Sequence, residues 1–109
     1  MFKLDANPTF TRSVEVLVPA DGGHRKETLS ATFCVLDVEE AGRYDLYDRQ
    51  GTRDFLERVI QRLDDIAGED GKPVPYSDAV RDQVLALPYA RLALARAYFE
   101  AVAGAARGN

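Results

Sequence analysis

The chain has 109 residues, a formal net charge of −4 and a pI near 4.9, and 46% of its residues are hydrophobic. These values are those of one soluble globular domain over residues 1–109, and the acidic balance disfavours nucleic acid, whose phosphates need a basic face. One cysteine excludes an internal disulfide, and the sequence shows neither a signal peptide nor an apolar run of the ~18 residues that a membrane span needs.

Two segments of alternating polarity predict an antiparallel β-hairpin over about residues 10–36. One face of each strand is apolar, formed by Val14, Val16 and Val18 in the first and by Leu29, Ala31, Phe33 and Val35 in the second. Pro19 is expected to end the first strand, because proline cannot donate to a sheet ladder. The "DGGH" stretch that follows predicts a tight turn containing His24.

Helical patterns fill the rest of the chain, over about residues 38–48, 52–67, 78–87 and 88–103. The predicted N-caps are Asp37, Thr52 and Ser77, and Gly68 is a predicted helix stop. The second helix is predicted from apolar residues at helical spacing: Phe55, Val59, Ile60, Leu63 and Ile66. The predicted fold class is α+β, with an N-terminal antiparallel hairpin packed against three or four C-terminal α-helices.

No group of residues predicts catalysis, and we expect no enzyme activity, metal or cofactor. The acidic loop "GEDGKPVPYSD", from Gly68 to Asp78, lacks ligands at the offsets of a calcium loop and is interpreted as a connector. Cys34 has no basic sequence neighbours and is interpreted as a packed apolar residue. The acidic pairs at 39–40 and 64–65 are interpreted as solvated helix charges, because adjacent helical side chains diverge by about 100°.

The last helix, "LPYARLALARAYFEAVAG", carries more apolar surface than one buried face requires. Leu92, Ala95, Phe99 and Val102 share one face, and further apolar residues widen it. This helix is either the central core helix or a helix that also meets another chain, and we expect self-association. The candidate partner-binding residues are Leu85, Tyr89, Arg91, Leu92, Leu94 and Tyr98.

Several short motifs occur in a characteristic order along the chain. They are "VEVLVPADGG", "LSATFCVLD", "DFLERVI", "GEDGKPVPYS" and "RLALARAYFEAVAG", followed by the basic end "ARGN". In this order the chain resembles the tail assembly chaperones of long-tailed (siphovirus, lambda-like) bacteriophages and prophages. One departure is the absence of tryptophan, which many relatives carry near residues 62–63.

The resemblance implies a function by contact. Such chaperones bind the tape measure protein, a long helical chain with exposed apolar stripes, and keep it soluble while the tail tube assembles around it. The implied partners are the tape measure protein and the tail tube protein, in the cytoplasm of the bacterial host, with the chaperone absent from the mature virion. Two alternatives stay open: a tail structural or completion subunit retained in the virion, and a small metal-binding regulator.

Overall fold

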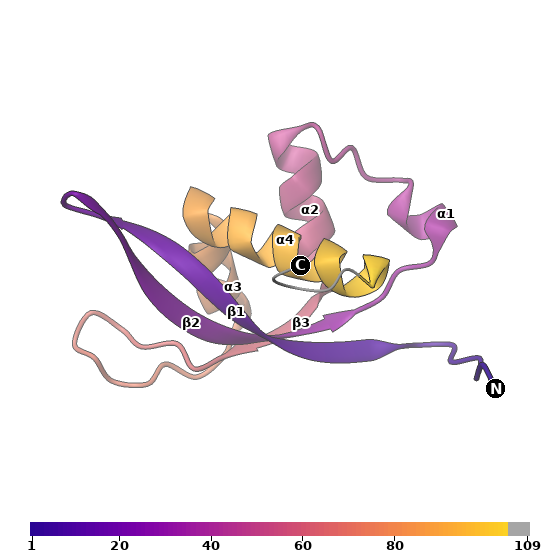
Figure 1. The fold of residues 1–109 in the computed structure, drawn as a ribbon, viewed down its shortest axis with the longest axis horizontal. Coiled ribbons are helices and arrows are strands. Elements are labelled where there is room, and N and C mark those ends of the chain that lie inside the picture. Colours follow the sequence, from indigo (N-terminus) through magenta and orange to yellow (C-terminus); the bar gives the residue numbers. More distant parts are fainter. Residues whose placement is uncertain (105–109) are drawn as a thin grey trace.

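A computed structural model describes residues 1–104; the tail "AARGN", predicted to fray, lies outside the described residues. The fold is α+β: three antiparallel strands in the order β1-β2-β3, with helices packed against one face of the sheet (Figure 1). Burial alternates along β1, where Val14 and Val16 are covered and Ser13 and Glu15 are exposed. The opposite face of the sheet is therefore open to solvent.

The predicted hairpin is confirmed as β1 (Thr9–Ala20) and β2 (Gly23–Cys34), paired in continuous register. The turn is the two residues Asp21 and Gly22, and only the second of them, Gly22, has a positive φ, of 76°, as the second central position of a type II turn requires. His24 therefore lies in β2, opposite Pro19, and the prediction that it lies in the turn was wrong. The strand also continues through Pro19 to Ala20, although proline was expected to end it.

Ladder geometry explains why Pro19 is tolerated. The Val35 N–H donates to the Pro8 carbonyl at 2.9 Å, so the even-numbered residues of this strand direct their backbone groups towards β2. Pro19 is odd-numbered, so the N–H that it lacks would point away from β2 at the outer edge of the sheet. The proline therefore removes no hydrogen bond between β1 and β2. Its position, with the missing N–H on the outer side of an edge strand, is one where strand prolines occur.

The helix predicted over 52–67 is shorter, and a third strand was missed. Helix α2 spans Arg49–Val59, and the chain then becomes extended as β3 (Ile60–Asp64), pairing with Ser30–Phe33 of β2. The register shifts between Thr32 and Phe33, and this irregularity places Ile60 and Leu63, three residues apart, both in the core. A spacing of three is also the helical spacing, which is why the stripe was interpreted as one helix.

The prediction of a helix over residues 38–48 was also wrong in its length. Helix α1 is the single turn Val38–Ala41, capped by Asp37, whose carboxylate accepts from the Glu40 N–H at 2.8 Å. It ends at Gly42, and residues 43–48 form an irregular loop. Asp48, not Thr52, caps α2 by accepting from the Gly51 N–H at 3.0 Å.

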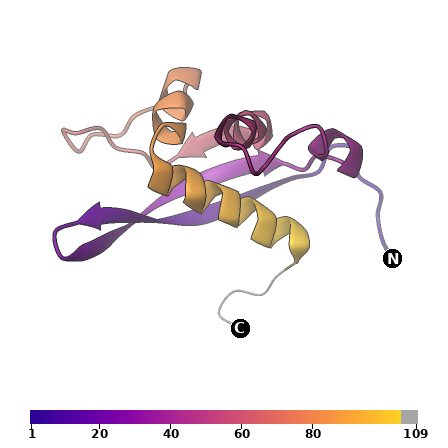
Figure 2. The same cartoon turned by 90° about the horizontal axis from the view of Figure 1, so that it is seen from above.

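The connector after β3 behaves largely as predicted. Gly68 does not end a helix, but Asp70 and Gly71 form a turn, with φ of 79° at Gly71 and the Asp70 carboxylate accepting from the Lys72 N–H. Ser77 caps α3 (Asp78–Leu85), as expected. Helix α4 (Pro88–Ala103) then begins with proline at its first position and crosses over the sheet (Figure 2).

The core forms between the sheet and helices α2, α3 and α4. Its largest fully buried side chains are Phe33, Phe55, Leu56, Leu63, Leu85, Leu94, Val14 and Val59. Tyr98 joins three elements: its ring lies 5.2 Å from that of Phe55 and 5.6 Å from that of Phe33, between centroids. Its hydroxyl accepts a hydrogen bond from the Leu36 N–H at 3.3 Å.

The buried Tyr98 hydroxyl predicts a loss of stability at alkaline pH. Burial raises the pKa of Tyr98 above its ordinary value of 10.0, outweighing the Leu36 hydrogen bond, which lowers it. The folded protein therefore keeps this proton to higher pH than the unfolded chain, and the free energy of unfolding falls as the pH rises above 10.0.

Urea unfolding at several pH values measures this effect. Tyr98→Phe should lose about 1 kcal/mol at neutral pH through the missing hydrogen bond and show a shallower alkaline decline than the wild type. Tyr47→Phe is the matched control, because Tyr47 is fully exposed. Parallel alkaline declines in Tyr98→Phe and wild type would contradict the assignment.

Candidate interaction surface

Helix α4 has two apolar faces, one covered and one exposed. The inner face buries Ala90, Leu94 and Tyr98, at intervals of four residues, against the core. The outer face carries Leu92, Ala95, Phe99 and Val102, at intervals of three, four and three, which we call the outer α4 stripe. Leu92 is 59% exposed, Phe99 38% and Val102 44%. Such spacing is that of the a and d positions of a helix seam.

The structure separates the six residues predicted to bind a partner. Leu85, Leu94 and Tyr98 are buried in the core, and Tyr89 is half-buried. Arg91 is also half-buried and donates to the Leu85 carbonyl, at 2.9 Å from Nε and 2.6 Å from Nη2. Of the six, only Leu92 lies on the outer α4 stripe. Phe99 and Val102 were placed on its face by their spacing but were not among the six.

A first hollow, which we call the loop hollow, lies between the outer α4 stripe and the loop before α2. It measures about 660 Å³. The loop contributes Leu46, Tyr47 and Asp48, the start of α2 contributes Arg49, and α4 contributes Arg91, Leu92, Ala95 and Phe99. Tyr47 is fully exposed and Leu46 is 40% exposed. These two residues were missed because a helix was predicted over residues 38–48.

Hydrogen bonds fix this loop against the helices. The Thr52 hydroxyl donates to the Leu46 carbonyl at 3.0 Å, and the Tyr47 N–H donates to the Asp45 carboxylate at 3.0 Å. Arg91 reaches across from α4 to the Arg49 carbonyl at 3.3 Å. A Cβ at Gly51 would lie 2.0 Å from the Asp45 carbonyl oxygen, so the loop passes over α2 where only glycine fits. The loop hollow is thus a built feature of the fold.

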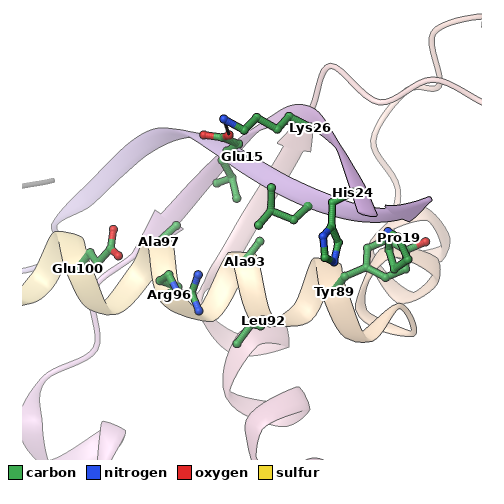
Figure 3. A pocket seen from close by; sticks show the side chains of 12 residues that line it. Glu15, Pro19, His24, Lys26, Tyr89, Leu92, Ala93, Arg96, Ala97 and Glu100 are labelled. Atoms are coloured by element: carbon green, nitrogen blue, oxygen red, sulfur yellow. Dashed lines mark ion pairs between the residues drawn. The ribbon is translucent and has the colours of Figure 1, made fainter. Parts of the chain in front are cut away.

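A second hollow, which we call the hairpin hollow, lies between α4 and the distal half of the hairpin (Figure 3). It measures about 520 Å³. Its hairpin side includes Glu15, Leu17, Pro19, His24 and Lys26, and its helix side includes Tyr89, Leu92, Ala93, Arg96 and Ala97. Glu15 and Lys26 form an ion pair at 3.3 Å along one rim. Leu92 lines both hollows.

Cys34 has a basic neighbour that the sequence did not indicate. Arg58 of α2 donates to the Cys34 sulfur at 3.3 Å and grips both carboxylate oxygens of Glu40, at 2.7 and 3.3 Å. The hydrogen bond to Glu40 is the main effect that raises the pKa of Arg58, and Cys34 adds smaller effects in the same direction. Partial burial of the guanidinium acts in the opposite direction but is outweighed. The Arg58 guanidinium therefore links α2 to α1 through its ion pair with Glu40, and we interpret its contact with Cys34 as structural.

The pair Glu39 and Glu40 diverges on a helix, as predicted, whereas Asp64 and Asp65, also predicted to be helical, lie at the end of β3 and in the turn after it. Glu40 pairs with Arg58, whereas Glu39 approaches Arg43 at 4.0 Å. Asp64 pairs with Arg62, whose hydrogen bond lowers the pKa of that carboxyl, and the next residue, Asp65, turns the chain with φ of 61°. Within residues 1–104, no three His, Cys, Asp or Glu side chains gather closely enough to hold a metal ion. No helix in that range is long and apolar enough to cross a membrane.

Gly51→Ala should destabilise the protein by about 1–3 kcal/mol, because the added methyl group forces the 45–48 loop off α2. This reverses the usual order, since alanine in a helix interior is normally favoured over glycine by about 1 kcal/mol. Urea unfolding measures the change. Gly23→Ala is the control, because nothing lies within 4 Å of its added Cβ. Equal stability of the two variants would show that the loop does not need this close approach.

Comparisons of the chain with family models, with curated proteins and with solved structures found no match. Functional inference therefore depends on the described surfaces and on the order of motifs in the sequence.

Proposed function

We propose that this protein is a tail assembly chaperone of a long-tailed bacteriophage or prophage, which binds the tape measure protein and keeps it soluble while the tail tube assembles. The ordered resemblance of the sequence motifs, from "VEVLVPADGG" to "RLALARAYFEAVAG", motivates this proposal. Under this proposal, the protein acts in the host cytoplasm during assembly and is absent from the mature virion, and the tail tube protein is a second partner.

The outer α4 stripe is the observation that carries the proposal. A helix whose apolar residues recur at intervals of three and four accepts another helix in side-by-side packing, with its side chains interlocked. The tape measure protein of the resembling family is a long helix with apolar stripes, which is the complementary shape. Leu92, Phe99 and Val102 are exposed on α4 although comparable side chains on its inner face are buried, and Phe99 also stacks on Phe55 at 5.4 Å between ring centroids, so the free protein leaves a row of apolar groups partly uncovered along this helix.

The loop hollow widens this surface beside the helix. Tyr47 and Leu46 stand on one wall and the outer α4 stripe forms the other, so a docked helix would contact apolar groups on two sides. The hydrogen bonds of Thr52 and Arg91 hold the walls in place before binding, which lowers the ordering cost of association. The net charge of −4 favours solubility of a complex in which long apolar stripes are covered.

Co-expression with the tape measure protein encoded beside it tests the proposal. The chaperone should increase the soluble fraction of that protein and co-purify with it. A double variant, Ala95→Lys with Val102→Lys, should weaken the complex roughly tenfold or more, because two lysines then enter an apolar contact. Val38→Lys is the matched control, since Val38 is 91% exposed on α1, away from α4.

Two results would overturn the proposal. One is the absence of any gain in tape measure solubility together with the absence of co-purification. The other is recovery of the protein in stoichiometric amounts from purified virions by mass spectrometry, which would favour a retained tail subunit. If the complex forms but the double variant binds as well as Val38→Lys, the partner lies on another surface.

A further inference from the structure

The N-terminal segment Met1–Asp5, which we call the arm, precedes β1 and belongs to no helix or strand. Phe2 is 89% exposed and Leu4 is 88% exposed, and alternate residues of an extended segment share a face. The Asn7 N–H donates to the Asp5 carboxylate at 3.0 Å, in a bend that turns the arm away from β1. Figures 1 and 2 both show the N-terminal end pointing away from the body, at the end opposite the hairpin turn.

The outer edge of β1 is an unpaired template for an extended segment. This strand is the first in the sheet order, so only β2 pairs with it. Its odd-numbered residues point their backbone N–H and C=O groups outward, and Ser13, Glu15 and Leu17 find no backbone partner there among the described residues. Such an edge accepts another strand through main-chain hydrogen bonds.

The hairpin hollow lies beside the distal half of this edge, and apolar residues line both of its sides. Leu17 is 46% exposed on one wall, and Leu92, Ala93 and Tyr89 stand on the other. Figure 3 shows Ala93 and Ala97 on the side of α4 that faces the hairpin, where their short side chains leave room. A strand added to β1 at this point would be covered by α4 on one side.

We propose that the arm of one copy adds to the outer edge of β1 in a second copy, where Phe2 and Leu4 fill the hairpin hollow. Residues opposite one another in an antiparallel pair share a face of the sheet. With Phe2 opposite Leu17 and Leu4 opposite Glu15, both arm side chains lie on the face whose residues line the hairpin hollow. The backbone groups of Phe2 and Leu4 then face the outward groups of Leu17 and Glu15.

The reach of the chain assigns the arm to a different copy. Within one copy, the arm leaves the sheet at Pro8, and Phe2 lies six residues before it, a span of about 20 Å when fully extended. Leu17 lies nine residues beyond Pro8 along β1, about 30 Å away. The arm therefore cannot fill the hairpin hollow of its own chain, whereas a second copy running antiparallel brings its arm to that position.

Light scattering and sedimentation of the full chain over a concentration range test this pairing. The wild type should form a dimer, and Phe2→Ser with Leu4→Ser should raise the dimer dissociation constant roughly tenfold or more. Both residues are exposed, so thermal melts of the monomer should be unchanged. Val38→Ser, which removes an equally exposed apolar group on α1, should leave the constant unchanged. A wild type that stays monomeric at millimolar concentration would overturn the pairing, as would a dimer that the arm variant leaves intact.

Cysteine pairing locates the contact. In a Cys34→Ser background, a copy carrying Phe2→Cys mixed with a copy carrying Leu17→Cys should form a disulfide-linked dimer under mild oxidation. Replacing the second copy by one with Val38→Cys should abolish the product. Equal yields from the two mixtures would show that the arm does not bind preferentially at the edge of β1. The experiments involve no phage protein and leave the outer stripe residues Ala95 and Val102 untouched, so their failure is separable from failure of the proposed function.

Discussion

The packing of α4 against β1 is the contact on which the rest of the molecule depends. Ala90, Ala93 and Ala97 face the sheet, and their small side chains allow the helix to lie close to the strand. Tyr98 completes the contact, with its ring among Phe33, Phe55 and Phe10 and its hydroxyl on the Leu36 N–H. A larger residue at these alanine positions would lift the helix and uncover the aromatic cluster.

This close packing also decides which apolar residues remain outside. Once the inner face of α4 is committed to the sheet, Leu92, Ala95, Phe99 and Val102 must point away from it, because helical positions three and four apart share a face. The loop of residues 43–48 and the distal hairpin flank the exposed side without covering it. The two hollows and the outer α4 stripe therefore all follow from the packing of the inner face of α4 against the sheet.

Much of the fold could be predicted where local chemistry and tertiary structure agree. The alternation of Val14, Val16 and Phe33 predicts the hairpin, and Ser77 and Pro88 mark two helix starts correctly. β3 was missed because the register shift in β2 allows Ile60 and Leu63 to share the core at helical spacing. The loop before α2 was missed because Gly51 matters only through its approach to Asp45, a contact that no sequence pattern records.

The candidate site could be predicted only to the level of the helix. Leu92 and Leu94 are chemically identical and two residues apart, yet one is 59% exposed and the other is fully buried. Periodicity reveals that α4 has two apolar faces but cannot say which one the sheet will cover, since both satisfy the same rule. That choice depends on the neighbours, here the alanines that fit against β1.

The distribution of polarity limits how the protein can act. The open face of the sheet carries Thr11, Ser13, Ser30 and Thr32, and the two threonine hydroxyls bond to each other at 2.9 Å. That face can stay in water without a partner. The large exposed apolar groups lie on α4 and at Leu87 just before it, on the adjacent loop, at Val38 of α1, at Leu17 and on the arm. Under the proposed function, such a surface would cover another apolar surface and release it again, because desolvation provides the affinity and no covalent step has to be reversed.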